Sequence, residues 1–300
     1  MIKQDVRRPR LTVFDRLVVA ALLILNSTVI LRSTVEPTFP TRIVSVVPAV
    51  TEILFAIGAG PQVVGASSFA RYPSEVNKLP RVGALLDPDV ERVLSLEPDL
   101  VILYESQTDT MSQISRAGIE VFPYRHGGIQ DVVDMLRELG RRTGHVVQGN
   151  NVAATIQSTV ANIAARLANR KRPRVLLVIG REPDTIRNIY ASGGIGFLND
   201  MIVAAGGQNI FADVPREAVQ PTSETILASE PDVIVEIRAE GMFTSDETTY
   251  QRDVWQALPA IPAVQKERVY FLNGNELIVP GPRLASGMER LARLLHPDAF

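Results

Sequence analysis

Residues 90–102, VERVLSLEPDLVI, and residues 223–235, SETILASEPDVIV, decide the fold, because the second stretch repeats the first at an offset of 133 residues (223 minus 90). The Glu, Glu, Pro and Asp positions are identical, and the apolar positions are in phase. Each stretch is typical of a short helix followed by a buried strand. A repeat at this distance indicates a duplicated lobe and not a solenoid, whose units recur roughly every 20 to 50 residues.

The same alternation continues on both sides of the repeat. Residues 42–47 (RIVSVV), 99–104 (DLVILY) and 174–179 (RVLLVI) are short apolar runs between helical patterns, as expected of buried parallel strands. The upstream helices of the two halves also correspond, since residues 53–60 (ILFAIGAG) resemble residues 201–207 (MIVAAGG). Strands that alternate with helices predict an α/β fold with two pseudo-repeated lobes, each built on a parallel sheet.

One long helical pattern separates the two halves. Within residues 146–170, spacings of 4, 3 and 4 separate the apolar residues Ile156, Val160, Ile163 and Leu167. About 25 residues of helix are about 37 Å long, which is enough to cross from one lobe to the other. We therefore expect a single long backbone helix to join the lobes.

The chain begins with a predicted leader. An apolar run over residues 17–31 follows the basic residues Lys3, Arg7, Arg8, Arg10 and Arg16, which is the pattern of an export signal. The run is short for a membrane span and lacks a clean cleavage site, so a cleaved signal, a retained anchor and a buried N-terminal helix remain alternatives. The predicted location is the periplasm, and a retained anchor would hold the chain at the inner membrane. The expected organisation is a leader or anchor over residues 1–35, a linker over 36–41, a first lobe over 42–145, a connecting helix over 146–171 and a second lobe over 172–300.

Composition removes several classes of protein. The hydrophobic fraction of 46% and the charged fraction of 21% exclude wholesale disorder and a polytopic membrane protein. The net charge is −2, and it becomes −6 without residues 1–35 (25 basic minus 31 acidic residues), so the basic footprint of a nucleic-acid binder is missing.

Catalytic and metal motifs are missing as well. The sequence has no cysteine, and the histidines, His126, His145 and His296, lie far apart, which argues against disulfides, thiolate sites and helical zinc motifs. There is no G-x-S-x-G elbow and no G-x-G-x-x-G loop. We expect no catalytic residue, no metal site and no cofactor, and an exported enzyme is the alternative from a different class.

Five stretches of the chain carry a resemblance when they are taken together. They are residues 42–67 (RIVSVVPAVTEILFAIGAGPQVVGAS), 67–73 (SSFARYP), 90–102, 204–213 (AAGGQNIFAD) and 223–235. As a set they resemble the helical-backbone (class III) periplasmic binding proteins of ABC importers for cobalamin, iron siderophores and haem, and among these most the cobalamin-binding members. The resemblance covers essentially residues 42–296. It implies two rigid lobes, a ligand held between them, and docking onto a membrane permease with its ATPase, and we expect the chain to be a monomer.

Glu91 and Glu224 occupy equivalent places in the repeat, each in the first turn of a predicted helix. An acidic residue there complements the positive end of the helix dipole, which is one explanation for both. The resemblance implies another, in which one carboxylate on each lobe pairs with arginines of the permease. The two explanations are compatible.

Ligand contacts are expected in the loops that follow the strands, where open α/β sheets form their crevices. The resemblance implies aromatic contacts with a flat macrocycle, a corrinoid, at Phe69, Tyr104 and Tyr190, although core packing is the alternative for any single ring. Tyr72 lies in the same loop as Phe69. Leu85 and Ala218 stand about where the cobalamin-binding relatives carry tryptophan. The predicted ligand-binding residues are Phe69, Tyr72, Leu85, Tyr104 and Tyr190.

An iron complex is the main competing ligand. An anionic siderophore would require cationic side chains in the cleft, and haem would require an axial ligand, for which Tyr72 or Tyr104 would have to serve. The arginines that could reach a cleft are Arg71, Arg181, Arg187, Arg238 and Arg283.

Overall fold

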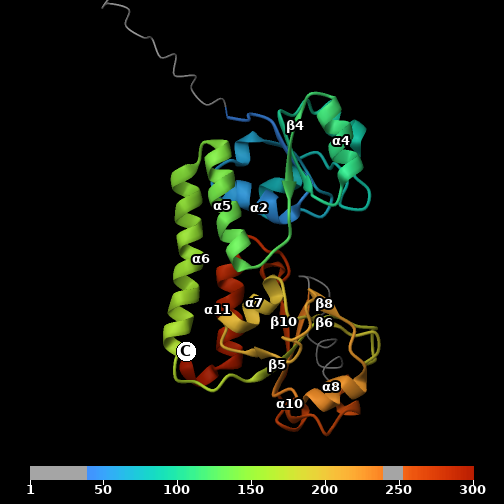
Figure 1. The fold of residues 1–300 in the computed structure, drawn as a ribbon, viewed down its shortest axis with the longest axis vertical. Coiled ribbons are helices and arrows are strands. Elements are labelled where there is room, and N and C mark those ends of the chain that lie inside the picture. Colours follow the sequence, from blue (N-terminus) through green and yellow to red (C-terminus); the bar gives the residue numbers. More distant parts are fainter. Residues whose placement is uncertain (1–38, 239–252) are drawn as a thin grey trace, which may run out of the picture. The chain divides into compact units, whose positions relative to one another are not determined.

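The computed structural model describes residues 39–238 and 253–300 (Figure 1). By its contacts the chain divides into residues 1–38 and residues 39–300, and all described residues belong to the second unit. The predicted leader over residues 1–35 lies outside the described residues, as do residues 36–38 of the predicted linker. Among the helices that are described, none is long and apolar enough to span a bilayer.

The first sheet is parallel, and its inner strands β1 and β3 are buried on both faces. Its order is β2-β1-β3-β4. In β3, Leu100 and Ile102 face the core that includes α2 and α5, whereas Val101 and Leu103 pack with residues of α3 and α4 on the other face. This double burial explains why the sequence of β3, LVILY, is an unbroken apolar run. The elements are β1 (Ile43–Ser45), α2 (Pro48–Ala56), β2 (Val63–Ala66), α3 (Val90–Ser95), β3 (Leu100–Tyr104), α4 (Thr108–Arg116), β4 (Glu120–Tyr124) and α5 (Ile129–Thr143).

The second sheet is mixed, which differs from the expected parallel arrangement. Its order is β10-β9-β5-β6-β8, and β7 pairs with β5. Strands β10, β9, β5 and β7 run parallel, but β6 is antiparallel to both β5 and β8. Only residues 181–189 connect β5 to β6, and a parallel crossover needs a dozen or more residues. The elements are β5 (Arg174–Gly180), β6 (Tyr190–Ser192), α7 (Phe197–Ala204), β7 (Gln208–Asn209), β8 (Ala218–Val219), α8 (Ser223–Ser229), β9 (Val233–Arg238), α10 (Pro262–Gln265), β10 (Val269–Asn273) and α11 (Leu284–Leu295).

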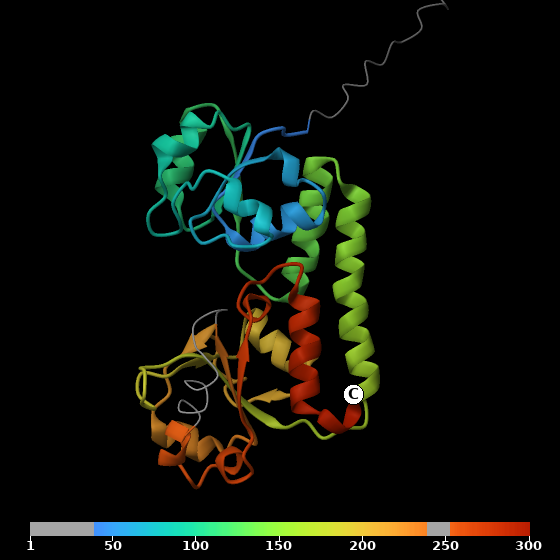
Figure 2. The same cartoon turned by 180° about the vertical axis from the view of Figure 1, so that it is seen from behind.

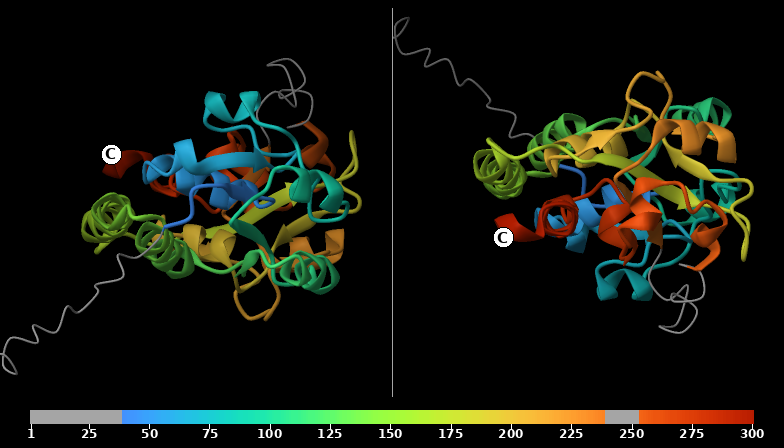
Figure 3. Two further views of the ribbon diagram at one scale, coloured as in Figure 1. Left: turned by 90° about the horizontal axis from the view of Figure 1, so that it is seen from above. Right: turned by 90° about the horizontal axis from the view of Figure 1, so that it is seen from below.

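A long helix, α6 (Val146–Leu167), connects the lobe of the first sheet to that of the second. It packs against α5 of the first lobe and α11 of the second (Figures 1 and 2), and Figure 3 shows α5 and α6 side by side, nearly along their axes. Two glycines permit the close approach of α5 and α6, because a Cβ added to Gly149 would lie 2.6 Å from the carbonyl oxygen of Leu136, and one added to Gly140 would lie 2.9 Å from that of His145. The predicted α/β class, with two lobes joined by one long helix, is confirmed.

The repeated sequence forms the same helix ends in both lobes. Asp89 caps α3 by accepting the backbone N–H of the third helical residue (2.8 Å), and Thr222 does the same for α8 (3.2 Å). After the helices, Glu97 and Glu230 both have left-handed backbones, with φ of +46° and +43°. The conserved spacing within the repeat therefore reflects a shared way of ending the helix and entering the strand.

The aspartate of each repeat fixes the start of a neighbouring strand. Asp99 accepts the backbone N–H of Arg42 (3.0 Å), and Asp232 accepts that of Arg174 (3.0 Å). Each of these arginines donates in turn to a carbonyl at the C-terminal end of the repeated helix, at 2.6 Å in the first lobe and 2.8 Å in the second. The identical aspartates thus serve the framework and do not belong to a ligand site.

Candidate ligand-binding site

An open hollow of about 640 Å³ lies at the carboxyl end of the first sheet. We call it the first hollow. It is lined by Phe69 from the loop after β2, by Tyr104 at the end of β3, and by Leu85 and Leu86 from the segment before α3. The structure thus brings together three of the five predicted ligand residues, Phe69, Leu85 and Tyr104. The remaining lining residues are Val46, Pro48, Ser67, Ser68, Gly83, Ala84 and Asp87.

The backbone holds Phe69 at the mouth of the first hollow. Its N–H donates to the hydroxyl of Ser67 (3.2 Å), and the N–H of Ser68 donates to the carbonyl of Gly83 (2.8 Å). Two guanidinium groups also brace this loop, since Arg71 donates to the carbonyl of Ser68 (2.7 Å) and Arg81 to that of Ser67 (3.0 Å). The Phe69 ring remains 70% exposed, so a large apolar area is available to a ligand.

Tyr104 forms a more enclosed wall. Its ring packs edge-on against Tyr124, with centroids 5.5 Å apart, and its backbone N–H donates to the side-chain oxygen of Gln107 (3.0 Å). Burial raises the pKa of the Tyr104 phenol. This rise makes the phenol harder to deprotonate than an ordinary tyrosine, which disfavours its service as an anionic axial ligand.

A tight turn over residues 84–87 forms the rim. Ala84 and Asp87 exchange backbone hydrogen bonds of 3.0 and 3.2 Å, and the side chains of Leu85 and Leu86 project from the tip. Gly83 has φ of +81°, and a Cβ there would lie 2.1 Å from the carbonyl oxygen of Asp87, so the turn requires glycine.

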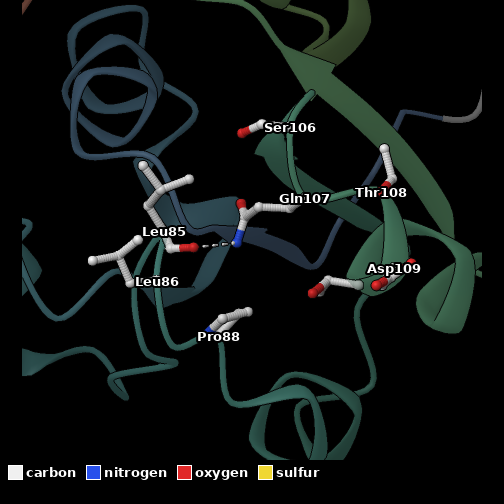
Figure 4. A pocket seen from close by; sticks show the side chains of 8 residues that line it. Leu85, Leu86, Pro88, Ser106, Gln107, Thr108 and Asp109 are labelled. Atoms are coloured by element: carbon white, nitrogen blue, oxygen red, sulfur yellow. Dashed lines mark hydrogen bonds between the residues drawn. The ribbon is translucent and has the colours of Figure 1, made fainter.

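Gln107 connects this turn to the end of β3. Its side chain is 8% exposed, accepts the N–H of Tyr104 and donates to the carbonyl of Leu85 (3.4 Å) (Figure 4). Sequence reasoning missed Gln107 and Leu86. The signal that could have found Gln107 is its position just past the end of a predicted strand, in the loop that follows Tyr104.

The other two predicted ligand residues lie elsewhere. Tyr72 does not line the first hollow, and its ring stacks under the guanidinium of Arg283, 4.1 Å from the ring centroid. Tyr190 lies in β6, exposed, and is also outside that lining. Ala218 lines a smaller hollow of about 190 Å³, together with His126 and Phe197, whose rings are 5.4 Å apart.

Arg283 joins the two lobes. Its guanidinium donates two hydrogen bonds to the Glu52 carboxylate of α2, at 2.6 and 2.9 Å, and a second carboxylate, that of Glu276, lies 3.8 Å away. Glu52 is only 5% exposed. Burial raises the pKa of Glu52, and the paired guanidinium opposes that rise.

Two further arginines of the second lobe are also engaged with a carboxylate. Glu236 of β9 accepts hydrogen bonds from Arg181 (2.9 Å), from Arg238 and from the indole of Trp255 (2.6 Å). Arg181 and Glu236 are fully buried in this pair. Of the five arginines predicted to be able to reach a cleft, Arg181, Arg238 and Arg283 already hold carboxylate partners. Arg187 is exposed, and Arg71 donates to the backbone carbonyl of Ser68 in the loop of the first hollow.

The two predicted docking glutamates are exposed. Glu91 lies in the first turn of α3, and Glu224 lies in the first turn of α8. A hydrogen bond from its own backbone N–H, and a second from the Thr222 hydroxyl, hold the pKa of Glu224 below its ordinary value. These hydrogen bonds agree with a role at the helix N-terminus and leave the carboxylate accessible.

Potential metal ligands are dispersed in the part of the chain that the structure describes, where no three His, Asp or Glu side chains come together. His145 packs against Gly58 at the end of α2, and His296 lies 3.1 Å from the carbonyl oxygen of Gly206 after α7. Both histidines therefore support helix ends at matching places in the two lobes.

Comparison with known proteins defines the class. Residues 43–276 match the family described as periplasmic binding protein, and the chain belongs to this family. It is an extracytoplasmic substrate-binding protein of the ABC transporter type, as the sequence motifs predicted. Such proteins bind a solute and work with a membrane permease and its ATPase, and the family is not enzymatic.

Individual relatives differ in their ligands. The chain is 32% identical to an uncharacterized ABC transporter substrate-binding lipoprotein, YvrC, of Bacillus subtilis, covering 87% of this chain and 82% of the relative. It is 28% identical to a vitamin B12-binding protein of Salmonella typhimurium, covering 79% and 86%. Among solved structures, the periplasmic heme-binding protein RhuT of Roseiflexus superposes with a TM-score of 0.70 at 26% identity, covering 86% and 99%.

Proposed function

We propose that the protein captures a corrinoid and delivers it to its ABC permease. The observation that carries this proposal is the first hollow, where Phe69, Leu85 and Tyr104 present apolar and aromatic surface around about 640 Å³ of open space. A flat macrocycle buries much apolar area against such walls. The 28% identity to a vitamin B12-binding protein supports the same ligand class.

Electrostatics favours a corrinoid over an anionic iron complex. Among the described residues that line the first hollow, none is basic, and Asp87 is acidic. Arg283 and Arg181, which could have attracted an anion, are held by Glu52 and Glu236. Arg71 and Arg81 lie beside the loop of Phe69 but are engaged with its backbone carbonyls and do not line the hollow. Haem or a ferric siderophore is the alternative ligand. The similarity to a heme-binding protein supports this alternative, so the experiment below includes both kinds of iron complex.

Thermal melting with three separate probes tests this proposal. We expect cyanocobalamin to stabilise the protein by about 2.7 kcal/mol at a hundredfold excess over Kd, since a ligand that binds the folded state alone adds RT ln(1 + [L]/Kd). Ferric haem and ferrichrome should stabilise it much less. Stabilisation by either iron complex without an effect of cyanocobalamin would contradict the corrinoid assignment, and turnover of a bound probe would favour an enzyme.

We also propose that Glu91 and Glu224 dock onto the permease, one from each lobe. Their equivalent positions and exposure support this role, and neither side chain lines the first hollow. The double variant Glu91→Ala, Glu224→Ala should abolish transport and retain its affinity for cyanocobalamin. A matched variant, Glu97→Ala with Glu230→Ala, alters the other repeated glutamates and should still transport. Equal loss of ligand binding in the docking variant would count against the assignment.

The leader completes the proposed role. Residues 1–35 would direct export and, if uncleaved, would hold the protein at the inner membrane through their apolar run. A cysteine-linked lipid, the anchor of a lipoprotein, cannot form on these 300 residues because they contain no cysteine.

A further inference from the structure

A second hollow, of about 430 Å³, lies on the other side of the turn over residues 84–87. Leu85 and Leu86 line both hollows, so the turn is a partition between them. Leu86 is 96% exposed at its tip. An apolar residue that is this exposed between two hollows is well placed for a ligand that lies across the partition.

The two walls of the second hollow differ in chemistry (Figure 4). One wall is apolar and consists of Leu85, Leu86 and Pro88. The other follows β3 into the first turn of α4 and carries hydroxyl, amide and carboxylate groups. These polar lining residues are Ser106, Gln107, Thr108, Asp109 and Thr110.

The charge of the residues that line the second hollow determines which polar groups of a ligand it can accept. Asp109 is acidic, and none of the described residues that line the hollow is basic. A carboxylate arm of a ligand would be repelled by Asp109, whereas a carboxamide arm can donate its N–H groups to carboxylate and hydroxyl oxygens. The hollow is therefore complementary to uncharged hydrogen-bond donors.

We infer that the second hollow binds the carboxamide arms of a macrocycle whose ring lies in the first hollow. This inference rests on the proposed function and adds to it the chemical class of the ligand periphery, which carries neutral amides and not carboxylates. Asp109 is the specificity-determining residue. Gln107 is a positioning residue, because its side chain ties the partition to the end of β3 at Leu85 and Tyr104.

Cyanocobalamin and its monocarboxylates, in which one propionamide arm is hydrolysed, test the inference when titrated as separate isomers at pH 7. We expect wild-type protein to bind at least one monocarboxylate about tenfold more weakly than cyanocobalamin, because Asp109 repels the new carboxylate. In Asp109→Asn, the two affinities should agree to within about twofold. Asp213→Asn, which changes an exposed aspartate of the second lobe, should keep the tenfold difference.

Melting temperatures of both variants should match the wild type, because both side chains are exposed and the substitutions conserve shape. The inference is overturned if every isomer binds as cyanocobalamin does, or if the difference persists in Asp109→Asn. If wild-type protein does not bind cyanocobalamin at all, the proposed function itself fails, which is a distinct result.

Discussion

Arg283 illustrates how a cationic side chain near a ligand site can be committed to the protein itself. Its guanidinium is bidentate on Glu52, lies 3.8 Å from Glu276 and stacks on Tyr72. The two carboxylates thus neutralise its charge, and the Tyr72 ring covers its planar face. The same residue therefore links the two lobes, and its charge is committed to carboxylates of the protein. The cations that contact the loop of the first hollow are instead Arg71 and Arg81, which donate to the backbone carbonyls of Ser68 and Ser67.

The Glu52 carboxyl gives this link a pH dependence. Burial raises the pKa of Glu52 above its ordinary value of about 4.3. At a pH between these two values, the folded protein binds more protons than the unfolded chain does. Stability therefore falls as pH rises through this window. We expect the free energy of unfolding of wild type, relative to that of Glu52→Gln, to decrease as pH rises above the ordinary carboxyl pKa in a series of denaturant titrations.

Glu138→Gln is the control with the opposite sign. Its hydrogen bond from Arg141 lowers the pKa of Glu138, so wild type relative to this variant should gain stability as pH rises through the ordinary carboxyl range. The same slope for both comparisons would show that burial does not dominate at Glu52.

Position along a strand indicates which side chains gather at one edge of the first sheet, whereas their role in ligand binding stays a prediction. Phe69, Leu85 and Tyr104 line one hollow because loops at the carboxyl ends of parallel strands meet at one edge. The engagement of Arg283 by Glu52 could not be predicted, because the two residues are 231 positions apart and no local pattern marks the pair. The contact of Gln107 with Leu85 could not be predicted either, because it depends on the path of the turn over residues 84–87.

At the scale of elements, long patterns were predictable and short ones were not. The helix over residues 146–170 and the strands over 99–104 and 174–179 correspond to α6, β3 and β5, since burial imposes a repeating pattern on each. Strands β6 and β8 have three and two residues, which is too short for any periodicity. Their antiparallel pairing follows from a short connection that the sequence pattern does not reveal.

The contact of α5 with α6 yields a test at this scale. Alanine in a helix is ordinarily about 1 kcal/mol more favourable than glycine. At Gly149 the added methyl would lie 2.6 Å from the carbonyl oxygen of Leu136, so we expect Gly149→Ala to destabilise the protein by about 1 to 3 kcal/mol in denaturant titrations. Gly180→Ala is the control, because nothing lies within 4 Å of a Cβ there. An unchanged or higher stability of Gly149→Ala would contradict the close packing.

At the scale of the molecule, several contacts besides α6 connect the lobes. One apolar cluster includes residues of α2, α5, α7 and α11, and the Asp200 carboxylate of α7 accepts the N–H of Ile129 at the start of α5 (3.0 Å). Together with Glu52 and Arg283, these contacts resist a hinge motion. We expect X-ray scattering curves with and without cyanocobalamin to superpose, and a large compaction on binding would contradict a rigid receptor.

The central claim is that one corrinoid binds in the first hollow, and calorimetric titration of cyanocobalamin into wild type and Phe69→Ala tests it most directly. We expect one molecule bound per chain, with about tenfold lower affinity in the variant because an aromatic contact is removed. The melting temperature of the ligand-free variant should be unchanged, since the Phe69 ring is mostly exposed. Equal affinity of the two proteins, or binding of haem or ferrichrome in place of cyanocobalamin, would contradict the claim.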